Sequence, residues 1–332
     1  QIPRRIDVPA FILSIAGLFA LVYGIIQAGI DHWTAPNVLY GLVAGAVLLA
    51  IFVFWELRTP HAMLQIRFFK NLSFTGANVA LTLVAFSLMG CLFFLSQYLQ
   101  SVHGYSPFQA GVRLLPIVGA AFVGSALSAL IAQSITTKFA VALGFLVGAG
   151  GLFFMSREVA VTTGYPTLAL GMCIVAAGIG VAMSPATNSI MGSVPVSEAG
   201  VGSAMNDTTR EVGGALGVAV LGTLLNSTYV SKIDGTNWQV SIPSQLLAAI
   251  RSSIQGAHIA AQNIANPQLL RLVISTANQA FTSGMAHGLL VAGIIMVITS
   301  GVTFIILPAR VRPYQQDSHT VQGTSPSEKT DK

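Results

Sequence analysis

Long uncharged apolar stretches, separated by short charged or turn-forming segments, run along most of the chain. A helix needs about 20 apolar residues to cross the hydrocarbon of a bilayer, so the distance between interruptions is the decisive measure. Eight stretches satisfy it, namely residues 8–27, 37–55, 74–99, 108–133, 139–155, 165–184, the interval between Glu211 and Lys232, and 285–307. The pattern therefore predicts an all-α integral membrane protein with about eight transmembrane helices.

The longest uncharged stretch, residues 71–112, exceeds a single crossing and contains the sequence HGYSP at His103–Pro107. A cluster of this composition marks a turn, which divides the stretch into the third and fourth spans. Pro116 is expected to kink the fourth span, because proline removes a backbone hydrogen bond. Pro185 is expected to bend the end of the sixth.

Composition supports a membrane protein. Of the 332 residues, 53% are hydrophobic and only 8% are charged, with a mean hydropathy of +0.73. An ordinary soluble domain carries about 25% charged residues, so a water-soluble core is excluded. The net charge of +5 would suggest nucleic acid in a soluble protein, but the basic residues cluster at the ends of apolar runs. The expected partner is the lipid bilayer, and no nucleic acid is expected.

The basic residues also predict an orientation, because cytoplasmic loops are enriched in Lys and Arg. With the N-terminus inside, 11 of the 16 basic residues fall on the inner side: Arg4, Arg5, Arg58, Arg67, Lys70, Lys138, Arg210, Arg310, Arg312, Lys329 and Lys332. The outer side then holds Arg113, Arg157, Lys232, Arg251 and Arg271. We therefore expect a multi-pass protein of the plasma membrane with both ends of this chain in the cytoplasm.

Three segments are not expected to cross the membrane. Residues 59–73 mix apolar and basic side chains, which suits a cytoplasmic segment at the membrane interface. Residues 232–284 form an outer loop that is partly helical, since Leu246, Leu247, Ile250 and Ile254 recur at helical spacing. Residues 309–332 are expected to be a disordered cytoplasmic tail. The chain starts with Gln1 and lacks a signal-peptide pattern, so we expect a fragment or a processed product.

Ionisable groups are scarce inside the predicted spans. The six histidines are isolated, and neither HExxH nor CxxC spacing occurs. Cys91 and Cys173 lie in apolar runs and are interpreted as small buried hydrophobic residues. We therefore predict no catalytic residue, no metal site and no cofactor, which argues against an enzyme.

The candidates for substrate contact are neutral polar residues, Asn78 and Gln97 in the third span and Asn188 beyond the sixth. Such groups face either another helix or a water-filled cavity. For each, an interhelical hydrogen bond is the favoured interpretation and substrate contact the alternative. Asn78 and Gln97 are nineteen positions apart on one helix, so they cannot share a depth, and Gln97 belongs near the outer end.

The candidates for gating or structural roles are charged. Arg113 interrupts the apolar start of the fourth span, where it either extends to the interface or pairs across a helix contact. Asp207, Arg210 and Glu211 precede the seventh span at helical neighbour spacing. An ion-pair network at an inner gate is one hypothesis for them, and a solvated helix end is the alternative.

Four motifs resemble one family. The segments are RRIDVPAFIL at 4–13, ELRTPHAMLQIRFF at 56–69, YLQSVHGYSPFQAGVRLLP at 98–116 and AGVGSAMNDTTREVGGALGVAVLG at 199–222. They are similar to the C-terminal part of the fourteen-helix drug:proton antiporters of the major facilitator superfamily.

This resemblance implies that residues 1–58 form two central helices and residues 74–308 the C-terminal six-helix transporter domain. It also implies export of drugs or other small amphiphilic molecules in exchange for protons by alternating access. The proton gradient would supply the energy. Six N-terminal helices of the same polypeptide would be missing, together with the glycine-rich antiporter motif and the proton-binding acidic residues.

Two other functions stay open. One is export of a specific metabolite, such as a siderophore or an antibiotic, by the same fold. The other is a membrane-embedded sensor or enzyme without transport, against which the scarcity of intramembrane catalytic groups argues.

Overall fold

The computed structural model describes residues 7–31, 33–59, 66–134, 136–195, 198–236, 238 and 242–307. These residues fold into helices joined by short connections: α1 Val8–Ile30, α2 Pro36–Arg58, η1 Ile66–Lys70, α3 Leu72–Gln97, η2 Tyr98–Val102, α4 Pro107–Ser134, α5 Thr137–Glu158, α6 Tyr165–Gly192, α7 Ala199–Asp234, α8 Ser244–Ser252, α9 Ile254–Ala261 and α10 Pro267–Ile306. Of the predicted non-spanning segments, residues 60–65 and the tail 309–332 lie outside the described residues.

Eight of the helices are long and apolar enough to cross a membrane, which confirms the predicted fold class. The helices that contain the last two predicted spans are longer than those spans. α7 has 36 residues and α10 has 40, and at 1.5 Å per residue they are about 54 and 60 Å long. The hydrocarbon core measures only about 30 Å, so both helices extend well beyond it.

The start of α10 explains why this helix is longer than its predicted span. We expected the last span to begin at Met285, yet the helix begins at Pro267 and continues through Gly284. Asn266 caps it, its side chain accepting a hydrogen bond from the Gln268 backbone N–H at 2.9 Å. Proline then occupies the first helical position, where its missing N–H costs nothing. Local capping thus starts the helix eighteen residues before the membrane-length stretch.

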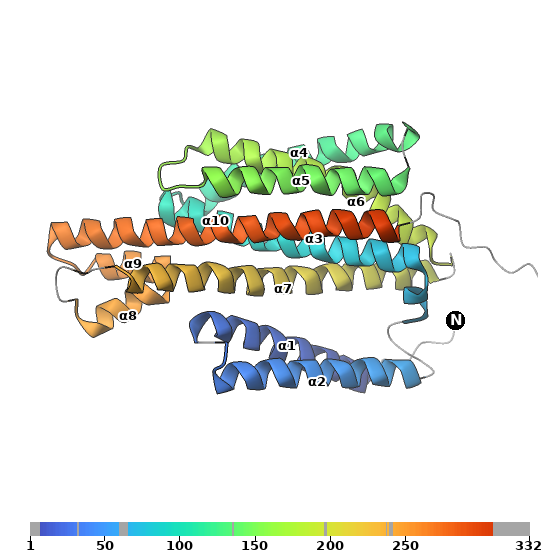
Figure 1. Ribbon diagram of the computed structural model, residues 1–332, viewed down its shortest axis with the longest axis horizontal. Helices are drawn as coiled ribbons and strands as arrows, with labels where there is room; N and C mark the ends of the chain where they lie inside the picture. Colours follow the sequence, from blue (N-terminus) through green and yellow to red (C-terminus); the bar gives the residue numbers. More distant parts are fainter. Residues whose placement is uncertain are drawn as a thin grey trace, which may run out of the picture.

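The extended ends of α7 and α10 gather with α8 and α9 at one end of the molecule (Figure 1). We define the cap as residues 229–236, 238 and 242–279, and we name the ends of the molecule the cap end and the opposite end. A buried apolar core holds the cap together, formed by Ile250, Ile254, Ala257, Ala260, Ala261, Val273 and Ala277. The predicted outer loop is therefore mostly a packed helical subdomain.

Six of the long helices, α3–α7 and α10, form a bundle with internal symmetry. α3 packs on α7, α4 on α6, and α5 on α10. If α3, α4 and α5 are exchanged with α6, α7 and α10, in that order, the same three pairs result. The exchange also converts the α3–α10 contact into the α6–α5 contact. This is the contact pattern expected of two inverted three-helix repeats. The α7–α10 contact lacks a close counterpart, because α4 barely touches α5.

Glycines set the closest helix contacts. A Cβ atom added at Gly217 of α7 would overlap the carbonyl group of Phe86 in α3, and one added at Gly213 would overlap that of Thr82. On α6, Gly180 lies against the backbone of Ala121 in α4. Small residues permit this approach between membrane helices, where apolar burial alone supplies little driving force.

The hairpin of α1 and α2 is a separate unit that packs on the bundle through α1 and α7. Thr223 donates its hydroxyl proton to the carbonyl of Ile25 at 2.8 Å, and Asn226 donates an amide proton to that of Gly29 at 2.7 Å. Gly29 has no side chain to separate the helices, since a Cβ there would lie 3.1 Å from the Thr223 Cα. Two side chains of α7 thus fix the end of α1.

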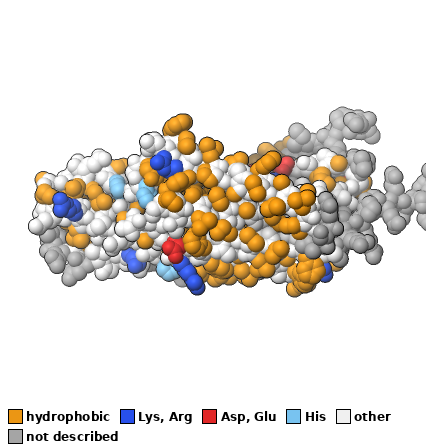
Figure 2. Space-filling view, turned by 90° about the horizontal axis from the view of Figure 1, so that it is seen from above, with side chains coloured by type: hydrophobic (Ala, Val, Ile, Leu, Met, Phe, Trp, Pro, Cys, Tyr) orange, Lys and Arg blue, Asp and Glu red, His pale blue; other side chains and the backbone are white. Residues whose placement is uncertain are grey.

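Much of the surface is apolar. Hydrophobic side chains cover most of the middle of the face in Figure 2, while Lys and Arg lie mainly toward the cap end. α4 illustrates this surface, because Phe108 is 81% exposed and Phe122 is 75% exposed. A surface of this kind is suited to contact with lipid tails or another apolar surface.

Substituting Gly217 by alanine should separate α3 from α7. Overpacking of a close contact costs about 1–3 kcal/mol, so we expect a melting temperature lower by several degrees. The measurement is thermal unfolding in detergent with a thiol-reactive fluorescent maleimide, which reaches the buried Cys91 only on unfolding. Gly150→Ala in α5 is the control, since nothing lies within 4 Å of its Cβ position. Equal melting temperatures of Gly217→Ala and Gly150→Ala would show that the α3–α7 contact at Gly217 is unimportant for stability.

Candidate functional site

A cavity of about 300 Å³ lies at the cap end, between α1, α3, α7, α10 and the α8–α9 junction. Its walls are mainly apolar, with Ile26, Phe93, Val218 and Phe281 among them. The polar residues on the wall are Gln97, Thr223, Asn226, Tyr229, Ser252 and Ser253. None of the described residues that line it is charged. The cavity therefore suits an uncharged, largely apolar group.

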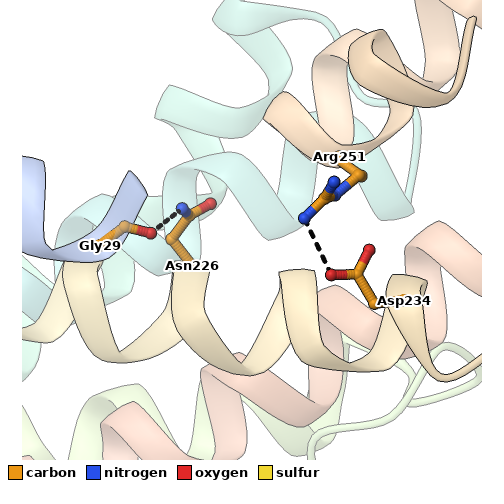
Figure 3. A network of polar contacts seen from close by, with 4 residues as sticks. All are labelled: Gly29, Asn226, Asp234 and Arg251. Carbon is orange, nitrogen blue, oxygen red and sulfur yellow. Dashed lines mark hydrogen bonds and ion pairs between the residues drawn. The ribbon is translucent and has the colours of Figure 1, made fainter. Parts of the chain in front are cut away.

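Two polar contacts of the cap lie near this cavity. The Tyr229 hydroxyl donates to the carbonyl of Ile250 at 2.7 Å, which joins α7 to α8. Arg251 forms an ion pair with Asp234 at 2.9 Å, close to the Asn226–Gly29 contact that anchors α1 (Figure 3). Because both ion-pair partners are about half exposed, this pair contributes little to stability.

The three predicted polar candidates lie apart. Gln97 lines the cavity at the cap end, and its side-chain oxygen accepts a hydrogen bond from Gln255 of α9 at 3.1 Å. Asn78 is buried near the start of α3, where it accepts a hydrogen bond from Thr209 of α7 at 3.1 Å. Asn188 lies exposed near the opposite end of α6. Asn78 is thus an interhelical contact, and only Gln97 belongs to the cavity.

Arg113 belongs to a stack of aromatic rings at the cap end. Its guanidinium lies 3.7 Å from the ring centre of Tyr105 and 5.7 Å from that of Tyr165. Tyr105 stacks on His103 at 5.6 Å, and His103 meets Tyr98 edge to face at 4.8 Å. The stack joins the end of α3 to α4 and α6. Arg113 therefore pairs across a helix contact, one of the two alternatives for this residue.

The surroundings of His103 in this stack disfavour its charged form. Burial lowers the pKa of its imidazole below 6.5, and the positive charge of Arg113 lowers it further. Its buried Nε2 has no hydrogen-bond partner among the described residues.

The charged candidates on α7 lie at the opposite end, far along the helix from the cavity. Asp207 and Glu211 are exposed and Arg210 is partly exposed. In the described part of the chain, no ion pair joins any of the three. Among the described residues these three side chains form no ion-pair network with one another, and their exposed positions fit the solvated helix end that was the alternative. A gating role for these residues remains a prediction.

Thr223 and Asn226 were not among the predicted site residues, although they are neutral polar residues in a span like Asn78. A search for neutral polar residues in every predicted span would have included both of them. Their contact with α1, 197 positions away for Asn226, has no signal in the sequence. Among the described residues, no group of three or more His, Cys, Asp or Glu side chains could hold a metal ion.

Comparison with known families identifies the fold. The sequence profile of the Major Facilitator Superfamily matches residues 8–218, nearly two thirds of the chain. The chain belongs to this superfamily. Its members are membrane transporters, which agrees with the eight candidate spans and the inverted repeat in the bundle.

Several curated relatives of the chain are named as resistance or efflux proteins. The chain is 28% identical over 304 residues to the tetracenomycin C resistance and export protein of Streptomyces glaucescens, covering 90% of the chain and 56% of the relative. It is 29% identical over 310 residues to the multidrug efflux pump LfrA of Mycolicibacterium smegmatis, covering 90% and 58%. The chain thus spans little more than half the length of these relatives.

A solved superfamily structure has the same fold. A bacterial homologue of the human lysosomal transporter Spinster, in its inward-facing and unoccupied conformation, superimposes with a TM-score of 0.55. The match covers 90% of this chain and 67% of the other at 14% sequence identity.

Replacing Arg113 by alanine should loosen the aromatic stack. A cation–π contact is worth about 0.5–2 kcal/mol, so we expect amide hydrogen exchange in residues 98–106 to accelerate several-fold. Arg113→Lys should have a smaller effect, because ammonium keeps the charge but loses the flat stacking surface. Arg157→Ala provides a control at the same end. Unchanged exchange in Arg113→Ala would leave Arg113 as a simple interface anchor.

The lowered pKa of His103 predicts a pH dependence. The unfolded chain binds the proton more readily, so this contribution to stability is complete above pH 6.5 and decreases as the pH falls below it. Between pH 7.5 and 5.5, the wild type should lose more thermal stability than His103→Gln. Equal losses in the two proteins would contradict this role, since the other histidines are common to both.

Proposed function

We propose that the chain is the C-terminal eight-helix part of a fourteen-helix antiporter that exports drugs or other amphiphilic small molecules in exchange for protons. The observation that carries this proposal is the match along 90% of the chain to resistance and efflux proteins, of which it spans 56% and 58%. The names of these relatives refer to resistance, export and efflux, so we propose transport and not catalysis as the activity.

The mechanism we propose is alternating access. Two halves of such a transporter rock as rigid bodies around a site near the bilayer midplane. The six helices α3–α7 and α10 would be one half, and their paired contacts favour movement as one body. The α1–α2 hairpin would move with this half, because Thr223 and Asn226 bind it to α7.

The second half would be six further helices of the same polypeptide. The surface of α4 supports this proposal, since α6 is its main neighbour. Val118 and Phe122 are 66% and 75% exposed, and exposed apolar positions occur around much of the helix. Lipid would cover one side of α4 and the other half of the transporter the other.

Proton coupling would reside in that second half. The described acidic residues lie near helix ends or in the first part of α7, at Asp7, Asp31, Glu56, Glu158, Glu198, Asp207, Glu211 and Asp234. A carboxylate that binds the transported proton is expected at membrane depth. Asn188, exposed on α6, is the described residue of this chain that we propose for substrate contact.

We propose that the cap faces the outside of the cell and the opposite end the cytoplasm. The distribution of basic residues over the whole sequence supports this orientation, with 11 of 16 on the cytoplasmic side. The plasma membrane is then the site of action.

A second candidate function is export of one specific metabolite. It is favoured by the relative from Streptomyces glaucescens, whose name refers to a single compound, tetracenomycin C. The fold and the mechanism would be the same, and the difference would lie in the breadth of substrates.

Expression of the complete gene in an efflux-deficient bacterial host tests the proposal. We expect resistance to several unrelated amphiphilic compounds, and dye efflux that a protonophore abolishes because it collapses the proton gradient. A vector without the gene is the control. Resistance to one compound only would favour the specific exporter. Unchanged resistance across the whole panel, with the protein present in the membrane, would refute drug export.

A further inference from the structure

We propose that the cavity at the cap end is a binding site for a small neutral compound that carries both a hydrogen-bond donor and a hydrogen-bond acceptor, such as a carboxamide. The site lies between the α1–α2 hairpin and the bundle, and it is separate from the proposed path between the two halves of the transporter. It does not depend on the proposed transport activity.

Size and polarity define the class of compound. A volume of about 300 Å³ is at the lower end of the range for small-molecule sites. Since none of the described lining residues is charged, a charged ligand would be buried without a partner at a large energetic cost. The apolar walls favour an aromatic or aliphatic body that fills the space beside Phe93 and Phe281.

Most hydroxyl groups at the cavity are already committed to the protein. Thr223 donates to the carbonyl of Ile25, and Tyr229 donates to that of Ile250. Ser252 donates to the carbonyl of Ala249 at 2.7 Å. These groups fix α1 and the cap in place, so they have no proton left for a ligand.

Two amide groups and one hydroxyl keep unused capacity. Asn226 gives its NH₂ group to the carbonyl of Gly29, which leaves its side-chain oxygen as an acceptor. Gln97 accepts a proton from Gln255, which leaves its NH₂ group as a donor. Ser253 accepts from the Gly256 N–H and keeps its own proton. The wall of one cavity therefore offers a neutral ligand both an acceptor and donors.

Gly222 provides a way to fill this cavity. A Cβ atom there would meet only the Phe93 ring, at 3.8 Å, which is an ordinary contact. A larger side chain would therefore extend into the cavity without displacing the backbone. Gly217, one and a half turns earlier, contrasts with it, because any side chain there would overlap α3.

The test uses the full chain in lipid nanodiscs and the neutral photoprobe 4-benzoylbenzamide, with labelled peptides mapped by mass spectrometry. We expect saturable labelling of residues near Ile26, Phe93 or Gly222. Gly222→Leu should weaken labelling about tenfold or more by occupying the space. Gly200→Leu, on the same helix and with nothing within 4 Å of its Cβ position, should label like the wild type.

Two further comparisons test the chemistry. Gln97→Met keeps the shape but removes the donor, and one lost hydrogen bond should weaken the binding about fivefold. The charged analogue 4-benzoylbenzoate should label at least about tenfold less than the amide. These comparisons hold even if Gly222→Leu fails to fold, which its melting temperature will reveal.

Three outcomes would overturn the proposal. They are labelling that does not saturate, labelling that persists in a folded Gly222→Leu protein, and equal labelling by the amide and the carboxylate. A fourth arm uses a photoreactive phosphatidylcholine. If this lipid labels the same residues and the amide cannot displace it, the cavity holds a lipid tail. The test measures labelling and not transport. Failure of this site can therefore be distinguished from failure of the export function.

Discussion

Close backbone contact at glycine is the constraint on which the rest of this structure depends. Lipid tails are as apolar as the helices, so burying apolar side chains supplies little force for assembly, and packing and hydrogen bonds must hold the bundle together. Gly213 and Gly217 bring α7 onto α3, and Gly180 brings α6 onto α4. These two pairs are exchanged by the internal symmetry of the bundle. Close glycine contact therefore joins the two three-helix repeats at two symmetry-related places.

The position of α7 follows from that contact and determines the cavity. With one face against α3, α7 offers another face to α1, where Thr223 and Asn226 bind backbone carbonyls of the hairpin. Its extension beyond the bilayer carries Tyr229 and Asp234 to the cap. The cavity remains between these attachments because Gly222 adds no side chain there. One long helix thus organises the bundle, the hairpin and the cap.

The sequence predicted the fold class and the number of spans well, because charge spacing and bilayer thickness act locally. It did not predict how far α7 and α10 continue beyond their spans, where helix capping at Asn266 and packing inside the cap lengthen the helices. Of the polar candidates, Gln97 lies at the cavity and Asn78 between helices. The pairing of Asn226 with Gly29 could not be predicted, because it joins segments almost 200 positions apart.

Residue type alone therefore does not identify functional polar groups in this membrane protein. Asn78 and Asn226 carry the same amide, yet the buried Asn78 donates to Phe74 and accepts from Thr209, so both of its groups are used. Asn226 is partly exposed at the cavity wall and uses only its NH₂ group in the described hydrogen bonds. In apolar surroundings a hydrogen bond to this free oxygen is favourable, so a ligand that donates a proton to it would gain binding energy. A hydrogen-bonding group at the cavity wall that has no partner in the fold, such as the Asn226 oxygen, indicates a ligand site better than the polarity of the residue does.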